Sequence, residues 1–171
     1  MRPALSMNKK LVIDSSILIT LDRRRTLDEY LRRKKDEGYE ILIPRAIARE
    51  LLDEPKKYAE EIKERSPLLA TKILDSVERI NTAIEEGLMK VEMINYRKYS
   101  RTMNNVRKHL SRLEAKPEHA IKKGDPELII LVIQLYDKFK EKVLLSTKDK
   151  GLLRALKPFA KRVEYEVLEN P

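Results

Sequence analysis

Four acidic residues, widely separated in the sequence, stand beside the segments that we expect to form buried elements. Asp14 and Asp149 each follow a short apolar run that is typical of a buried strand. Asp125 heads a segment typical of a helix, and Glu50 lies about two turns into another helix. In parallel sheets, ligands gather outside the carboxyl ends of the strands. Carboxylate oxygens there would suit Mg²⁺ or Mn²⁺, and the cation would offset their mutual repulsion.

Each acid also has an ordinary structural interpretation when it is considered alone. Asp14, Asp125 and Asp149 are all placed to cap a helix, a role worth about 1 kcal/mol each. Glu50 fits equally well on the exposed side of a helix. The metal-site interpretation therefore depends on the fold bringing these four acids together.

The elements that must position these acids alternate between short apolar runs and amphipathic segments. We expect strands at residues 11–13, 41–43, 88–94 and 143–145, with an edge strand at 163–167 and a loop beginning at 14–16. Cap signals and apolar spacing predict helices at about 27–37, from 44 past 52, 67–87, 99–113, 125–139 and 149–156. Short apolar strands that alternate with helices predict an α/β fold with a parallel sheet covered on both faces.

The four acidic segments resemble, in order, the four motifs of PIN-domain nucleases, including VapC-like and archaeal members. The segments are LVIDSS at 11–16, IP with EL seven residues later at 43–51, GDPELII at 124–130 and LSTKD at 145–149. The resemblance spans nearly the whole chain. It implies one PIN-like domain over residues 1–171, an α/β/α sandwich around a parallel sheet of about five strands. Residues 1–10 would be an N-terminal extension, and 55–87 and 95–123 would be helical insertions.

The same resemblance implies an activity, a cofactor and partners. The activity would be a Mg²⁺- or Mn²⁺-dependent endoribonuclease that leaves a 5′-phosphate and a 3′-hydroxyl. Asp14, Glu50, Asp125 and Asp149 would be the catalytic, metal-binding acids, supported by the hydroxyls of Ser16 and Thr147. The role would be that of a toxin or of an RNA processing or decay enzyme. We expect a homodimer, and an antitoxin or regulatory protein as a further partner.

Net charge points independently to a polyanionic partner, first of all RNA. The chain has 37 Lys and Arg against 28 Asp and Glu, a net charge of +9. Residues 95–123 hold nine of the basic residues and only two acidic ones. We expect the RNA backbone and an unpaired base to contact Arg97, Lys98, Arg101, Arg107, Lys108, Arg112, Tyr96 and Tyr99. The alternative is a solvated helix face.

Composition excludes several other classes of protein. The absence of cysteine rules out a disulfide scaffold, a thiolate metal site and a cysteine nucleophile. The longest apolar run, 128–133, is too short to span a bilayer, and no secretory signal is visible, so we expect a soluble cytoplasmic protein. Abundant Lys, Glu and Arg with a single Gln are typical of hyperthermophile proteins.

Three other functions compete with the nuclease hypothesis. A non-catalytic RNA-binding or assembly protein would keep the fold and bind RNA without needing metal. His109 and His119 would have to act in a metal-free ribonuclease, but they lack a partner motif. A haloacid-dehalogenase-type phosphatase needs a second aspartate two positions after Asp14, where Ser16 stands instead.

Overall fold

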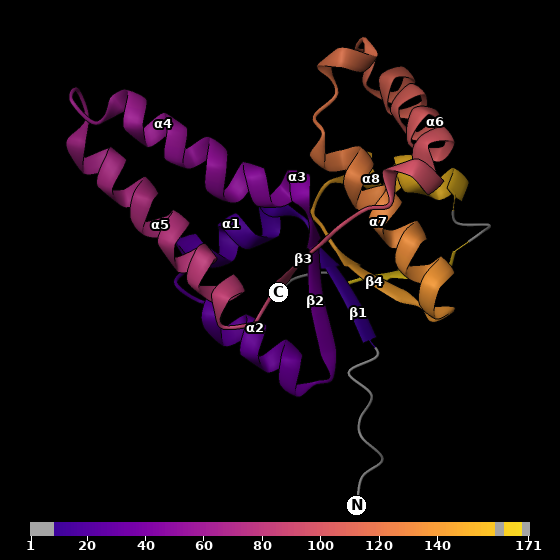
Figure 1. Cartoon of the computed structure of the whole chain (residues 1–171), viewed down its shortest axis with the longest axis horizontal. Helices are drawn as coiled ribbons and strands as arrows, with labels where there is room; N and C mark the ends of the chain where they lie inside the picture. The colour runs from indigo at the N-terminus through magenta and orange to yellow at the C-terminus, as the bar shows by residue number, and fades with distance from the viewer. Residues whose placement is uncertain (1–8, 160–162, 169–171) are drawn as a thin grey trace, which may run out of the picture.

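The fold is built on a parallel sheet of five strands, in the order β3-β2-β1-β4-β5 (Figure 1). A computed structural model describes residues 9–159 and 163–168. Every neighbouring pair of strands is parallel. The strands are β1 (Lys9–Ile13), β2 (Tyr39–Pro44), β3 (Lys90–Glu92), β4 (Val143–Ser146) and β5 (Tyr165–Val167). The expected α/β architecture is confirmed.

Helices occupy the connections between the strands. They are α1 (Ser15–Arg23), α2 (Leu27–Asp36), α3 (Arg45–Ala48), α4 (Glu54–Ile62), α5 (Pro67–Glu85), α6 (Tyr96–Glu114), α7 (Gly124–Phe139) and α8 (Lys150–Leu156). One π-helical turn, η1 (Arg49–Asp53), joins α3 to α4. Two short 3₁₀ turns, η2 (Glu118–Ala120) and η3 (Lys157–Phe159), complete the set.

The direction in which successive strands are added to the sheet changes between β1 and β4. From β1 the chain adds β2 and then β3 on one side, whereas β4 and β5 lie on the other side. Ile13 is in register with Ser146, and the Asp14 N–H donates to the Ser146 carbonyl at 3.0 Å. The carboxyl ends of β1 and β4 therefore lie side by side at the switch point, where ligands of parallel α/β sheets bind.

Helices cover both faces of the sheet. Helix α7 packs across β1, β2 and β4, and α6 packs on α7, while α2 packs on β2 and α1 lies beside it (Figure 1). The apolar run at residues 128–133 forms part of α7 and is buried over its whole length, so the expected buried helix is confirmed. Helices α4 and α5 form an antiparallel arm with its own small cluster of Ala59, Ile62, Ala70 and Ile73.

Three local expectations were wrong. Residues 14–16 do not begin a loop, because α1 starts at Ser15 directly after β1. The third strand covers only three of the seven residues predicted at 88–94. The boundary of the N-terminal extension at residue 10 is also wrong, because Lys9 and Lys10 pair with β2. Lys10 is buried, with its ammonium against Glu40 and over the Phe139 ring.

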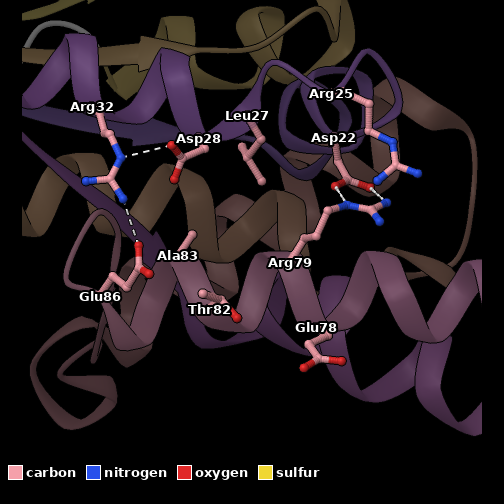
Figure 2. Close-up of a pocket in the computed structure, with 10 residues that line it drawn as sticks. All are labelled: Asp22, Arg25, Leu27, Asp28, Arg32, Glu78, Arg79, Thr82, Ala83 and Glu86. Atoms are coloured by element: carbon pink, nitrogen blue, oxygen red, sulfur yellow. Dashed lines mark hydrogen bonds and ion pairs between the residues drawn. The ribbon is translucent and has the colours of Figure 1, made fainter.

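Helix α1 is tied to the α4–α5 arm by an ion pair between a buried carboxylate and a half-buried guanidinium (Figure 2). Asp22 is buried and accepts two hydrogen bonds from the Arg79 guanidinium, at 2.7 and 3.1 Å, and one from Ser76 Oγ. Burial raises the pKa of Asp22, but the bonds from Arg79 and Ser76 outweigh it and lower the pKa overall. This satisfied network is structural: it fixes the arm against the body of the domain.

No helix within the described residues is long and apolar enough to cross a membrane.

Candidate active-site pocket

A pocket of about 290 Å³ opens at the carboxyl edge of the sheet, beside the switch point. All four of the acids that the sequence singles out line it. The full lining is Asp14, Ser15, Ser16, Glu50, Glu114, Lys116, Ala120, Lys122, Asp125 and Asp149. The fold thus brings together acidic residues that are more than 130 positions apart in the sequence.

Asp14 is held by hydroxyl groups rather than by helix capping. It occupies the N-cap position of α1, but its side chain makes no cap hydrogen bond within the described residues. Instead, Thr147 Oγ1 donates to Asp14 Oδ2 at 2.8 Å, and Ser16 Oγ approaches the same oxygen at 3.4 Å. Asp14 and Thr147 are both buried. The side chain is therefore oriented by a hydroxyl that follows β4, at the shortest distance, and by the longer contact with Ser16 in the first turn of α1.

Thr147 also connects Asp14 to Asp149. The Asp149 N–H donates to Thr147 Oγ1 at 3.0 Å, so that one hydroxyl group contacts both acidic residues. Asp149 Oδ1 accepts from the N–H groups of Gly151 and Leu152, at 2.8 and 3.1 Å. Asp149 therefore caps α8, as its structural interpretation predicted, and lines the pocket as well.

Glu50 reaches the pocket from the π-helical turn η1. A π turn shifts the register of the residues that follow it, and such turns are frequent at functional sites. Ser15 Oγ donates to Glu50 Oε2 at 2.9 Å. A Cβ atom on Gly124 would lie only 2.5 Å from Glu50 Oε1, so the carboxylate packs directly against the backbone at the start of α7.

Asp125 is the most strongly perturbed acid of the pocket. It lies in the first turn of α7, one residue after the helix begins, so it is not the N-cap. Burial, followed by the charges of Asp149 and Asp14, raises the pKa of Asp125 to about 7. The pKa of Glu50 is also raised, chiefly by burial and with a contribution from Asp14, while Ser15 and Lys122 act in the opposite direction.

The donor set of the pocket fits a hard divalent cation. Its acidic side chains offer only oxygen ligands, which suit Mg²⁺ and Mn²⁺. Burial is the main cause of the raised pKa values of Asp125 and Glu50, and the charges of neighbouring carboxylates add to it; a bound cation would offset that repulsion. Within residues 9–159 and 163–168, however, no three acidic or imidazole groups are already arranged as a metal site. Binding would require the side chains to adjust.

Comparison with known families agrees with this geometry. A family model described as "Halobacterial PIN domain" matches residues 7–167. The chain belongs to the PIN-domain family. No curated protein and no solved structure gives a significant match. The match confirms the resemblance seen in the four motifs. The PIN domain is a nuclease-type family whose members typically use divalent metal ions.

The basic residues predicted to contact RNA lie on α6 of the PIN domain, outside the pocket. The six are exposed: Arg97, Lys98, Arg101, Arg107, Lys108 and Arg112. The ring of Tyr96 is 45% exposed and remains available to a base. The expectation for Tyr99 was wrong, because Tyr99 is buried and its hydroxyl donates to Asp137 at 2.7 Å.

Sequence reasoning missed several residues at the site. Glu114 and Lys116 line the acidic pocket from the C-terminal end of α6 and the loop that follows it. Neither histidine of the chain lines the pocket, so the metal-free histidine mechanism has no geometric support there.

Proposed function

We propose that this PIN domain is a Mg²⁺- or Mn²⁺-dependent endoribonuclease, and that Asp14, Glu50, Asp125 and Asp149 are its catalytic acids. The observation that carries the proposal is their convergence in one pocket at the switch point of the sheet. Membership of a nuclease-type family supports it. The net charge of +9 favours a polyanionic substrate over a small neutral one.

The four acids would hold the metal ion, with Glu114 as a further carboxylate in reach of the same pocket. When bound, the ion would supply positive charge to the scissile phosphate and lower the pKa of a water molecule. Thr147 would fix the orientation of Asp14 and the backbone position of Asp149 through its one hydroxyl group. Ser15 would do the same for Glu50, to which it donates at 2.9 Å.

The exposed cations of α6 and the ring of Tyr96 would hold the RNA beside the pocket. Phosphate contacts position a strand without reading its sequence, and an exposed aromatic ring stacks on any unpaired base. Cleavage would leave a 5′-phosphate and a 3′-hydroxyl, as in the family. A toxin and an RNA processing or decay enzyme would share this chemistry.

The decisive experiment measures cleavage of an end-labelled single-stranded RNA with Mn²⁺, with Mg²⁺ and with EDTA. We expect cleavage that requires the metal and that falls by more than about 100-fold in Asp14→Asn, because even residues behind a metal ligand contribute 10- to 100-fold. Asp36→Asn is the matched control, since Asp36 is exposed at the opposite edge of the sheet. It should cleave like the wild type.

Two results would contradict the proposal. The first is cleavage that persists in EDTA, and the second is full activity in Asp14→Asn. RNA binding that depends on salt but not on metal, without cleavage under any condition, would instead favour the non-catalytic RNA-binding alternative.

A further inference from the structure

A second cavity of about 820 Å³ adjoins the acidic pocket on the side of η1. The two cavities share Ser15, Ser16, Glu50 and Lys122, so they form one continuous path along the surface. We call the second cavity the η1 groove. Its lining is Ser15, Ser16, Ile19, Ala46, Arg49, Glu50, Glu54, Lys122 and Lys123. Its volume lies within the range of pockets that hold a ligand of nucleotide size.

The η1 groove differs from the acidic pocket in its charge. Three cations, Arg49, Lys122 and Lys123, line the groove together with two carboxylates. Five carboxylates and two lysines line the acidic pocket. The three groove cations are exposed, and none of them forms a salt bridge with another described residue. They come from η1 and from the loop before α7, so the fold places them on both sides of the groove.

The amino end of α1 lies at the junction of the two cavities. Helix α1 has nine residues, and the side chain at its N-cap position, Asp14, is turned to Thr147 instead of the first-turn N–H groups. Such N–H groups are suitable donors to a phosphate. Lys122 lines both cavities at this junction and adds a positive charge beside these N–H groups.

We propose that the η1 groove binds the phosphate next to the scissile one on a single RNA strand, through Arg49 and Lys123. The inference rests on the proposed function, because it is the acidic pocket that defines the scissile position. One strand would run from the groove past Lys122 into the pocket. Lys122, which is shared by both cavities, contacts the backbone between the two phosphates.

The test is RNA binding without metal, measured by fluorescence anisotropy of a labelled single-stranded oligoribonucleotide in EDTA over a range of salt concentrations. Each phosphate neutralised on a single strand contributes about 0.7 to the slope of log K against log salt. The double variant Arg49→Ala/Lys123→Ala should therefore lower the slope by about 0.7 and the affinity at 0.1 M salt by about five-fold. Lys142→Ala is the control, since Lys142 is exposed at the amino edge of β4.

Cleavage with Mn²⁺ provides a second measurement. The double variant should raise KM about five-fold and leave kcat within about two-fold, because a contact remote from the reacting phosphate serves binding. An unchanged salt slope and an unchanged KM would overturn the proposal, as would a wild-type protein that does not bind RNA. If the wild type cleaves nothing but the double variant still lowers the slope, the groove stands and the proposed function fails.

Discussion

Replacing Gly124 with alanine tests the placement of Glu50 more sharply than removing the carboxylate does. The added Cβ would lie 2.5 Å from Glu50 Oε1 and 3.0 Å from Ile47 Cδ1. Because ordinary contacts begin at 3.4 Å, the carboxylate must move by nearly 1 Å. A displacement of about 1 Å in a catalytic group can cost about 100-fold in rate. We therefore expect kcat/KM for RNA cleavage to fall by about 100-fold in Gly124→Ala.

Stability should respond differently from activity. In a helix, alanine is favoured over glycine by up to about 1 kcal/mol, which offsets part of the cost of moving the Glu50 side chain. We expect the melting temperature of Gly124→Ala to remain within a few degrees of the wild type. Loss of cleavage would then reflect a displaced carboxylate and not an unfolded protein.

A double-mutant cycle isolates the contact between the two residues. In a Glu50→Ala background the clash with the carboxylate is absent and only the 3.0 Å approach to Ile47 Cδ1 remains, so Gly124→Ala should cost less stability than it does in the wild type. Gly151→Ala is the graded comparison, because its added Cβ would lie 3.0 Å from Asp149 Oδ1 and should cost less activity. Wild-type kcat/KM in Gly124→Ala would refute the reasoning, as would identical effects of Gly124→Ala on stability in both backgrounds.

Three further predictions concern charge and aromatic residues. The pKa of Asp125 is raised to about 7, so the folded protein holds an extra proton between pH 3.8 and 7 and loses stability as pH rises through that range. Mn²⁺ should therefore raise the melting temperature more at pH 8 than at pH 5.5. Asp125→Asn should abolish that difference. Asp22→Ala should cost about 2 kcal/mol in urea unfolding, because it removes the hydrogen bonds that a buried carboxylate accepts from Arg79 and Ser76. Asp28→Ala breaks an exposed pair and should cost under about 1 kcal/mol. Equal losses would contradict this difference. Tyr99→Phe should cost about 1 kcal/mol of stability and leave RNA affinity unchanged, because the Tyr99 ring is buried and its hydroxyl binds Asp137. Tyr96→Ala should weaken RNA binding, because the Tyr96 ring is exposed. The reverse pattern in anisotropy titrations would contradict both expectations.

The layout of the sheet and the convergence of the acids were predictable because strong local signals specify them. Apolar runs such as Leu11 to Ile13 are buried on both sides only in a covered parallel sheet. Once the strands are parallel, residues that follow β1 and β4 must share one edge. The placement of Asp14 and Asp149 in one pocket therefore follows from the pattern alone.

Other features depend on tertiary contacts that no local pattern encodes. The start of α1 at Ser15 was missed because Asp-Ser-Ser is typical of a loop, and here Asp14 is bound by Thr147 from another strand. The π turn that carries Glu50 has no signal in the sequence, and the close approach of Glu50 to Gly124 joins residues 74 positions apart. The burial of Tyr99 is different, because a local pattern does encode it: Tyr99 lies on the same apolar stripe of α6 as Met103, Val106 and Leu110.

The arrangement of supports around the acids indicates why one fold would tolerate so much negative charge in a small space. Asp14, Asp149 and Glu50 each accept hydrogen bonds from hydroxyl or amide donors, which stabilise their charged forms. Among the described hydrogen bonds, none is made by the Asp125 side chain, and Asp125 is the acid whose pKa rises to about 7. The acid without such a donor therefore shows the strongest rise in pKa, caused mainly by burial and then by the charges of Asp149 and Asp14. A cation bound by the pocket would displace the proton of that group, so that metal affinity should increase with pH up to about 7 and level off above it.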